Sequence, residues 1–386
     1  MLDVIVVGGG PGGLYAGLRL ARRGLDVVVL EEHQVVGDPV HCTGILAREA
    51  FDEFDLSRDS ILNELTTARF ISPAGNDIVY RTRAVEAVAV DRALFDARLS
   101  RDAERAGARV VLGARVSAVT READSVSVDV PGHETFSARS CVLACGGRYA
   151  LHRQLGLDVP PLLLHTAQRE LPAMRPGEVE IHFGRHVAPG GFGWAVPVWR
   201  GAQSFVRVGV MSESSAPRHF RELLERVGPR WGVETRLDGA PRQKILPLAR
   251  ISRTYQDRLI VVGDAAGLVK PTTGGGIYYS LLSACIGADV LTDALDRDDV
   301  TAERLAAYER QWRARLKREL DTQQSFRAIA QRMSDEDIEG LFTLARTDGV
   351  MPIVRRTASF NRHRKLILAL LRHQPARQLF FRSFVS

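Results

Sequence analysis

Cysteine is scarce in this sequence of 386 residues, and long apolar runs are missing from it. The four cysteines (Cys42, Cys141, Cys145 and Cys285) show no CxxC spacing, which excludes a disulfide framework and indicates reduced thiols in a cytoplasmic protein. No apolar run reaches the roughly 18 to 20 residues that a membrane-spanning helix requires. No basic leader precedes the first apolar segment, so we expect no signal peptide. We also predict no metal site.

Charge of one sign does not dominate most of the chain. Lysine and arginine total 52 and aspartate and glutamate total 46, so the net charge is +6. Apolar residues make up 45% and charged residues 25%, as in soluble globular proteins, which excludes a disordered or collagen-like chain. The basic excess gathers at the end, because residues 349–386 hold eight lysines or arginines and no acid.

A glycine-rich turn follows the first apolar segment. A short buried strand leads into Gly8, Gly10 and Gly13, which form a GxGxxG pattern before a helix, and a second strand runs into Glu31. In such a unit the first glycine permits the turn, the second lets the backbone approach a pyrophosphate, and the third lets helix and strand pack. The helix start attracts phosphate, and the acid accepts hydrogen bonds from a ribose. The unit predicts dinucleotide binding but leaves FAD and NAD open.

A distant segment favours FAD. Residues 258–262 read as a strand that ends in Gly263 and Asp264, and a loop with three consecutive glycines then opens a long helix near Ile277. An aspartate at a strand end suits a ribityl or ribose hydroxyl, and a glycine loop brings backbone N–H groups close to a flat ring. The loop residues predicted to touch the cofactor are Pro271, Gly274, Gly275 and Gly276.

These two glycine segments together resemble the FAD-dependent oxidoreductases of the para-hydroxybenzoate hydroxylase superfamily. Within it, the chain is most similar to the geranylgeranyl reductase family, over about residues 1–320. The segments that carry this narrower resemblance are residues 38–44 with His41 and Cys42, residues 90–96, residues 192–197, the Pro-Thr-Thr-Gly-Gly-Gly-Ile run at 271–277, and residues 308–313.

The resemblance implies an α/β fold, in which a Rossmann-like FAD-binding domain is interrupted by a mixed-sheet substrate lobe and followed by a helical C-terminal region. The ranges that we assign are 1–150 and 251–300 for the FAD domain, 151–250 for the substrate lobe and 301–386 for the C-terminal helices. Residues 66–90, with a hairpin at 69–81, contribute to the substrate side. Ligands would bind in the cleft between the two domains.

Hydrophobic periodicity predicts the remaining elements. The expected helices cover residues 91–106, 219–227, a stretch from about 277, and much of 301–345. The expected strands are 109–112, 116–120, 126–130, 141–144, 178–183, 193–198 and 205–210.

Two departures separate this chain from the family pattern. Cys145-Gly146 stands where the superfamily carries Asp-Gly, so an acid associated with cofactor binding is missing. Phe192 replaces the family's tyrosine and Val196 replaces its phenylalanine. The substrate lobe therefore has room to accept something other than the usual prenyl lipid.

The resemblance implies roles for three polar residues that also have plainer interpretations. Cys42 and His41 would lie near the flavin as catalytic residues, although a cysteine in a loop often fills small apolar space without chemistry. Arg92 would contact the phosphates or the adenosine side of FAD, unless it is a solvated charge at a helix start.

Other positions are equally open. Phe192, Trp194 and Pro197 would line the substrate cavity by resemblance, but aromatic residues are also common in the cores of strands. Lys270, just before the triple-glycine loop, is interpreted as a surface charge. The basic, leucine-rich tail from Gly349 is either a packed helix with a solvated face or a helix on an anionic membrane surface. Nucleic-acid binding is not expected, because no recognised module carries the charge.

The resulting hypothesis is an FAD-dependent oxidoreductase that reduces isolated C=C bonds of a polyprenyl, geranylgeranyl-type lipid by hydride transfer from reduced flavin. Because the sequence has no second dinucleotide fingerprint, NAD(P)H would bind transiently, or reduced ferredoxin would supply electrons. Two alternatives stay open. One is an FAD-dependent monooxygenase or halogenase acting on an aromatic substrate, and the other is a non-catalytic flavin-binding protein. We expect a cytoplasmic location, with or without peripheral membrane contact.

Overall fold

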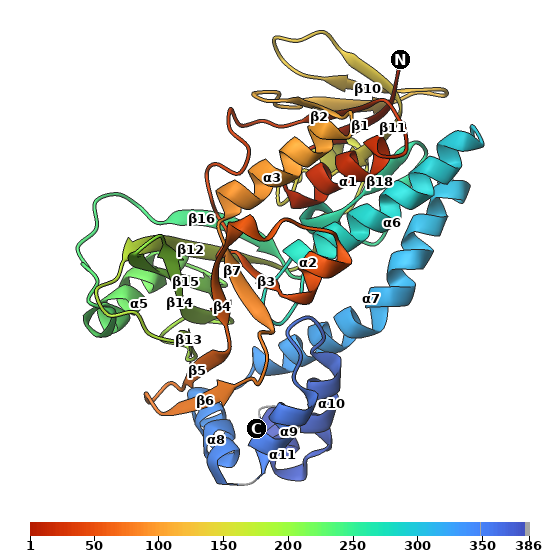
Figure 1. The fold of residues 1–386 in the computed structure, drawn as a ribbon. Coiled ribbons are helices and arrows are strands. Elements are labelled where there is room, and N and C mark those ends of the chain that lie inside the picture. Colours follow the sequence, from red (N-terminus) through yellow and green to blue (C-terminus); the bar gives the residue numbers. More distant parts are fainter. Residues whose placement is uncertain (348, 383–386) are drawn as a thin grey trace.

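A computed structural model describes residues 1–347 and 349–382 (Figure 1). Two large sheets and one small sheet make up its β structure, and a group of C-terminal helices lies at the opposite end from the chain's first strand. The mixed α/β architecture predicted from the sequence is confirmed, whereas the exact domain boundaries stay a prediction.

The first sheet has eight strands and a mainly parallel centre in the order β17-β18-β11-β1-β2-β8, with β10 and β9 added in antiparallel fashion at β11. Its strands are β1 (Leu2–Val7), β2 (Val27–Leu30), β8 (Arg109–Val111), β9 (Ala118–Arg121), β10 (Val126–Asp129), β11 (Phe136–Leu143), β17 (Tyr255–Gln256) and β18 (Leu259–Val261). The central strands are buried on both faces, which explains why they read as continuous β-branched runs.

Helices cover this sheet on the side drawn forward in Figure 1, where α1 (Pro11–Ala21) lies between α3 (Arg92–Arg105) and α6 (Ile277–Asp296). Small residues let α1 approach the sheet, because a Cβ at Gly17 would lie 2.7 Å from Cγ2 of Val29. The long helix α7 (Ala302–Ala330) packs against α6 and runs from this sheet to the C-terminal helices. Short elements complete this part: α2 (Glu49–Glu53), α4 (Ala150–Gln154) and the 3-10 turns η1 (Arg58–Ser60) and η2 (Gly263–Ala266).

The second sheet has seven strands in the order β16-β12-β15-β14-β13-β5-β6, and only the β13–β5 pair is parallel. The strands are β5 (Thr67–Ile71), β6 (Asp77–Arg81), β12 (Leu163–Pro172), β13 (Val179–His182), β14 (Phe192–Arg200), β15 (Gln203–Ser212) and β16 (Arg242–Pro247). Helix α5 (Ala216–Trp231) packs on β15, around a core that includes Phe220 and Trp231. The expected hairpin at 69–81 is confirmed as β5–β6, and it joins this sheet.

A third sheet has three strands in the order β3 (Ile45–Ala47), β7 (Ala87–Val90) and β4 (Ile61–Leu65). The last four helices are α8 (Asp335–Thr347), α9 (Val350–Thr357), α10 (Arg364–Arg372) and α11 (Gln374–Arg382). Met333, Ala376 and Phe380 form a small core there, so apolar side chains of the tail pack against the protein. Within the described residues, no helix combines the length and apolar character that crossing a membrane would take.

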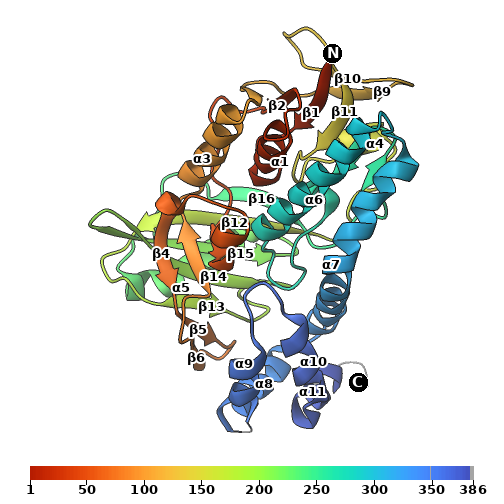
Figure 2. The same cartoon turned by 45° about the vertical axis from the view of Figure 1, so that its right-hand side comes forward.

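The connection between α9 and α10 leaves the helical group and rises toward the middle of the molecule, as both ribbon views show (Figure 2). This segment, residues 358–363, is called the strap below. Hydrogen bonds to several elements fix it. Asn361 donates to Oε1 of Glu49 at 2.8 Å, the Asn361 carbonyl accepts from the Tyr279 hydroxyl at 3.1 Å, and the His363 amide donates to Glu319 at 2.5 Å. The tail thus reaches the region between the two large sheets.

Candidate active site

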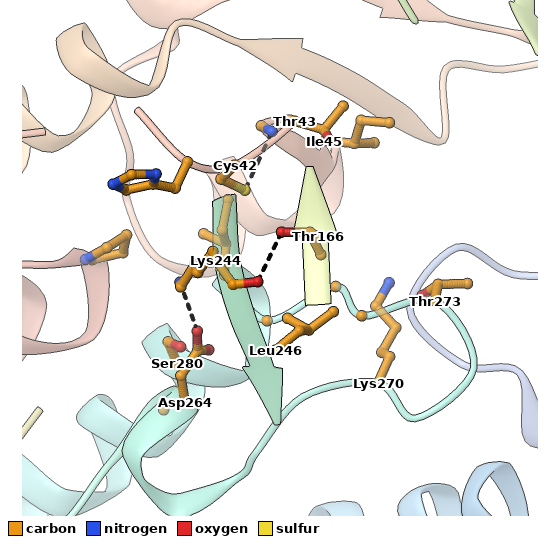
Figure 3. Close-up of a pocket in the computed structure, with 18 of the residues that line it drawn as sticks. Cys42, Thr43, Ile45, Thr166, Lys244, Leu246, Asp264, Lys270, Thr273 and Ser280 are labelled. Atoms are coloured by element: carbon orange, nitrogen blue, oxygen red, sulfur yellow. Dashed lines mark hydrogen bonds and ion pairs between the residues drawn. The ribbon is translucent and has the colours of Figure 1, made fainter. Parts of the chain in front are cut away.

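A cavity of about 360 Å³ lies at the carboxyl ends of β1, β11 and β18, facing the second sheet (Figure 3). Ligands commonly bind at this edge of doubly wound sheets. The cavity walls come from the first glycine loop, the cysteine loop, β12 to β16, the triple-glycine loop and the strap. Segments from both ends of the chain therefore meet at one site.

The structure brings both predicted glycine segments to this cavity. Gly10 lines it from the first loop, Gly263 and Asp264 line it from the end of β18, and the loop residues Gly274, Gly275 and Gly276 complete that wall. The two segments are separated by most of the sequence, yet they share one space. A single cofactor can contact both segments only if they line the same cavity, as they do here.

The glycines of the first loop serve different purposes. Gly8 has a φ of +108°, and a Cβ there would lie 2.5 Å from the Ala144 carbonyl oxygen. A Cβ at Gly13 would lie 1.9 Å from the Gly8 carbonyl oxygen. Both are therefore required by the protein's own packing. At Gly10, by contrast, a Cβ would meet no protein atom within 4 Å. The space next to Gly10 is therefore the approach that a ligand would need.

Several predicted residues lie outside the cavity lining. Gly8 and Gly13 of the first glycine loop do not line the cavity. Pro271, in the triple-glycine loop, and Pro197, in β14, are buried away from it. The carboxylate of Glu31 accepts hydrogen bonds from the Gly9 amide at 2.6 Å and from the His33 amide at 3.0 Å. Glu31 thus lies directly at the glycine loop, and its contact with a ribose stays a prediction.

Asp264 has a partner that sequence reasoning missed. The Lys244 ammonium lies 3.0 Å from Oδ2 of Asp264, and Asp264 is the main reason that the pKa of Lys244 is raised (Figure 3). Lys244 belongs to β16, a strand that the sequence did not predict, so no local signal linked it to the site. The pair holds a fixed positive and negative charge at one end of the cavity.

Arg92 and Cys42 line the cavity together. The Arg92 guanidinium bonds both oxygens of the buried Asp96, at 3.2 and 2.7 Å, and also interacts with the Cys42 thiol. Burial opposes the charge on Arg92, but Asp96 and then Cys42 raise its pKa. The sulfur of Cys42 accepts the Gly44 amide at 3.3 Å. Arg92 is thus not a solvated charge, and its first partner in the structure is an acid of its own helix.

His41 also lines the cavity, next to Cys42. Burial lowers the pKa of His41, and the charges of Lys244 and Arg242 lower it further. The imidazole is therefore neutral at neutral pH. Its buried Nδ1 has no hydrogen-bond partner among the described residues.

The opposite wall is apolar and aromatic. Phe192 and Trp194 of β14 line it together with Ile181, Met211 and Leu246. The indole Nε1 of Trp194 is buried, and in the part of the chain that the structure describes it has no hydrogen-bond partner. This wall is suited to a hydrophobic ligand.

An aromatic row continues outward from this wall. The ring of Phe192 lies 5.9 Å from Trp194 and 6.4 Å from Phe183, and Phe183 contacts both Phe70 and Phe342. The row thus runs from the cavity toward the β5–β6 hairpin and α8.

The interpretation of Lys270 as a surface charge is wrong. Lys270 is 3% exposed and lines the cavity, where its ammonium donates to the Phe360 carbonyl at 2.6 Å and lies 3.4 Å from Oδ1 of Asn361. Burial lowers its pKa to about 7. The strap covers this lysine, and nothing in the local sequence of the loop indicated that a segment 90 residues later would do so.

Cys145 cannot replace the acid that is missing from its position. Burial raises the pKa of its thiol to about 12, so the group is neutral at physiological pH. Its sulfur lies 3.3 Å from the Arg148 carbonyl, and the cavity is lined by the neighbouring Gly146 instead. Cys145 itself therefore contributes no negative charge at this strand end.

The described residues fit an FAD molecule. The approach next to Gly10 is open, the N-terminus of α1 points its free amides to that space, and Asp264 stands at a second strand end of the same cavity. Unpartnered buried polar atoms on Trp194 and His41 are typical of a ligand site rather than of a finished core.

Comparison with known proteins supports this assignment. The FAD binding domain family matches residues 1–323. A digeranylgeranylglycerophospholipid reductase from Methanocaldococcus jannaschii is 30% identical over 357 residues, which cover 88% of this chain and 89% of that protein.

Solved structures show the same fold. A geranylgeranyl bacteriochlorophyll reductase-like protein from Thermoplasma acidophilum has a TM-score of 0.84 at 23% identity, with 98% of each chain covered. The halogenase PltM, solved with phloroglucinol and FAD, has a TM-score of 0.71 at 18% identity, covering 98% of this chain and 85% of its own. The FAD-binding motifs, the match over residues 1–323 and the reductase relative agree. The chain therefore belongs to the geranylgeranyl reductase family, within the para-hydroxybenzoate hydroxylase-like superfamily of FAD-dependent oxidoreductases.

Proposed function

We propose that this protein reduces isolated C=C bonds in a prenyl lipid of geranylgeranyl type. The observation that carries the proposal is the meeting of two glycine loops and an aromatic wall at one cavity. The reductase relative from M. jannaschii has a name that points to the same lipid class.

We infer that FAD lies along the first glycine loop and the Asp264 loop. Gly10 with the α1 N-terminus would hold the pyrophosphate, while Gly8 and Gly13 would shape the loop. Glu31 would hold the ribose, and Arg92 the phosphate or adenosine side. The residues that would approach the flavin ring are Gly263, Asp264, Gly274, Gly275 and Gly276, with the buried Pro271 supporting the loop behind them. Bound and reduced, FAD supplies a hydride to one alkene carbon.

The substrate chain would occupy the aromatic side of the cavity. Phe192 and Trp194 would contact it, and buried Pro197 would support β14 behind them. An isolated alkene has no carbonyl that could hold developing charge, so its reduction requires a dry and closely fitting site. The row formed by Phe192, Phe183 and Phe70 offers such an apolar path for the rest of the chain.

Cys42 and His41 would tune the reaction from the other wall. The Cys42 thiol touches the Arg92 guanidinium, while the lowered pKa of His41 leaves little imidazolium for proton donation at neutral pH. Cys42→Ser should keep the flavin but slow reoxidation of the reduced enzyme by the lipid, measured by stopped-flow absorbance. An unchanged rate would remove Cys42 from the site.

The electron donor is proposed to be NAD(P)H bound transiently or reduced ferredoxin, since the chain carries one dinucleotide fingerprint. Both donors can be compared directly by the rate at which each bleaches the oxidised flavin under anaerobic conditions.

We also propose a cytoplasmic protein that contacts the membrane peripherally through its basic C-terminal region. A hollow of about 460 Å³ is lined by Arg81 and Arg83 near the end of β6 and by Arg355 of α9. Among the described residues, one acid lies within ion-pair distance of these arginines: Glu178, 3.7 Å from Arg81. Three guanidinium groups around a hollow suit an anionic lipid headgroup.

The function is tested with purified, FAD-loaded protein. After anaerobic reduction, a geranylgeranyl phospholipid should reoxidise the flavin, and mass spectrometry should find two added hydrogens per reduced bond. Oxygen consumption coupled to a hydroxylated or halogenated aromatic product would instead support the monooxygenase or halogenase alternative. If no substrate reoxidises the flavin faster than air does, the non-catalytic alternative gains.

A further inference from the structure

Lysine is rare in this basic protein. Of the 52 basic residues, four are lysines and 48 are arginines. Two of the four lysines, Lys244 and Lys270, line the active-site cavity. Arginine is effectively always charged, whereas a lysine can release its proton when its surroundings disfavour the charge. In a chain whose basic residues are mostly arginines, a lysine that lines the active-site cavity therefore indicates a position where proton release can matter.

The loop geometry reserves a path for the Lys270 side chain. Its amide donates to the Gly275 carbonyl at 3.1 Å, and its own carbonyl accepts from the Gly274 amide at 2.8 Å. A Cβ at Gly275 would lie 2.9 Å from Cε of Lys270, so glycine at this position lets the side chain pass. The triple-glycine loop and Lys270 thus form one rigid unit at the cavity wall.

The Lys270 ammonium has one more N–H donor than it has protein acceptors among the described residues. A charged lysine carries three N–H donors. In the described ranges 1–347 and 349–382, two acceptors lie within hydrogen-bond distance of Nζ: the Phe360 carbonyl at 2.6 Å and Oδ1 of Asn361 at 3.4 Å. Nζ also lies 4.0 Å from the centre of the Phe360 ring. Because Lys270 lines the cavity, its third N–H is available to a ligand there.

The two cavity lysines differ in their electrostatics. Lys244 is paired with Asp264 and keeps its charge, because that carboxylate raises its pKa. Lys270 has no carboxylate within ion-pair distance among the described residues, and burial dominates there. Figure 3 shows Lys244 and Lys270 on either side of Leu246. One lysine is therefore fixed as a charge, and the other is able to give up its proton.

We propose that the Lys270 ammonium is the general acid that delivers a proton to the substrate's double bond. This inference rests on the proposed function. The alkene π bond breaks, and two C–H bonds form: one carbon takes the hydride that reduced FAD supplies, and the other takes the proton from Nζ. The lipid is reduced by two electrons and FAD is oxidised by two. The lysine is left as a neutral amine and recovers its proton from solvent.

A purely structural role is the competing explanation, because Lys270 also anchors the strap. Arginine separates the two roles: it keeps the charge and reaches the same carbonyl, but it does not release a proton near neutral pH. Tyr279→Phe provides a second separation, since it removes the strap's hydrogen bond from the Tyr279 hydroxyl to the Asn361 carbonyl and leaves both acceptors of the Lys270 ammonium in place. Lys317→Met is the matched control for loss of a surface lysine, one that pairs with Asp321.

The kinetic test follows lipid-dependent reoxidation of the reduced holoenzyme in single turnovers. A positioned general acid contributes roughly 10²- to 10⁴-fold, so K270R and K270M should both be slowed by that factor, with FAD affinity and chemical reduction of the flavin unchanged. Y279F and K317M should stay close to wild type. A K270R enzyme with wild-type reoxidation, or Y279F as slow as K270M, would overturn the donor role.

The pH profile should have a defined sign. Because the donor must be protonated, the wild-type rate should be constant at low pH and fall as pH rises through about 7. The other titratable groups facing Nζ are Glu319 of α7, Glu49 of α2 and His363 of the strap. In K270R the fall near pH 7 should disappear. A fall that persists in K270R would assign it to another group and contradict the proposal.

A direct titration gives a readout that does not depend on turnover. Holoenzyme labelled with ¹³C-lysine has four side-chain signals, and K270R identifies the one from Lys270. We expect that signal to titrate near pH 7, and titration close to the ordinary lysine value of about 10.4 would overturn the proposal. If the wild-type enzyme reduces no prenyl alkene, the proposed function fails, and the donor role falls with it. If it does reduce the lipid and K270R does too, the donor role alone is lost.

Discussion

At the scale of single residues, the glycines of the first loop separate folding from binding. Gly8 and Gly13 are needed because the backbone itself would collide with a side chain, whereas Gly10 faces open space. The sequence pattern alone cannot distinguish these cases, because all three are the same residue in one motif. Gly10 is therefore where we propose that the ligand approaches the loop.

Gly10→Val should therefore abolish FAD retention while leaving the fold intact, because a Cβ at this position meets no protein atom within 4 Å and the valine side chain would fill the phosphate approach. Gly13→Ala is the matched variant: its Cβ would lie 1.9 Å from the Gly8 carbonyl oxygen, so it should lower the melting temperature of the protein even without flavin. Absorbance at the flavin bands measures FAD retention in both variants, and thermal unfolding measures their stability. A yellow Gly10→Val protein would contradict this loop assignment.

Arg92 illustrates a site residue that also stabilises the fold. Its side chain is 13% exposed and that of Asp96 is 5% exposed, so removing the guanidinium leaves a buried carboxylate without its partner. Arg92→Met should cost about 3–5 kcal/mol of unfolding free energy, measured by urea denaturation of the apoprotein.

The double variant R92M/D96L is the control for this prediction. It should recover much of the loss, because replacing a whole buried pair by apolar groups is often close to neutral. If Arg92→Met instead loses FAD with unchanged apoprotein stability, then the cofactor contact is the residue's main role.

At the scale of elements, local pattern was sufficient for the dinucleotide unit but not for the second sheet. The continuous β-branched runs of β1 and β2 and the capped helix α3, where Asp91 accepts the Leu94 amide at 3.2 Å, carry strong local signals. The strands β12 and β16 mix charged, polar and apolar residues without clear alternation, and only their pairing with each other and with β15 orders them. Lys244 was missed for that reason.

The strap is an element whose position depends on tertiary contacts alone. His363 holds it through the Thr272 hydroxyl, 2.7 Å from Nδ1, and through the Phe360 carbonyl, 3.1 Å from Nε2. Burial, and then the charge of Lys270, lower the pKa of His363 to about 4. A basic tail rich in leucine gave no indication that one of its connections would close the active site.

Acid should therefore loosen the strap. The unfolded imidazole takes up a proton below about pH 6.5, whereas the folded one does so only near pH 4, so the stability is lost as pH falls across that window. The effect should be on the order of 2–3 kcal/mol and should be absent in His363→Gln. Urea unfolding at several pH values measures it, with hydrogen exchange of residues 358–363 as the local readout. Equal pH dependence in both proteins would contradict the assignment.

At the scale of the whole molecule, the site depends on where distant segments meet. The sequence was enough to pair the first glycine loop with the Asp264 loop and to place Cys42 and Trp194 among the candidates, because each stands in a recognisable motif. The motifs could not indicate Phe360 and His363, which follow α7 by some distance and reach the cavity only through the packing of the tail on α7 and α8. Burial, which separates Lys270 from a surface lysine, is likewise a property of the complete fold.

Membrane contact is also a property of the assembled surface, because Arg81 and Arg83 come from the hairpin and Arg355 from the tail. Each basic residue near an anionic surface contributes about 1 kcal/mol, so replacing all three by glutamine should weaken binding to phosphatidylserine vesicles by roughly 100-fold. The loss should shrink at high salt because surface charges are screened. The matched control replaces three exposed arginines of the dinucleotide-binding side, Arg101, Arg105 and Arg115. Sedimentation with vesicles measures both triple variants, and an equal loss in the two would mean that net charge, rather than this hollow, directs the protein to the membrane.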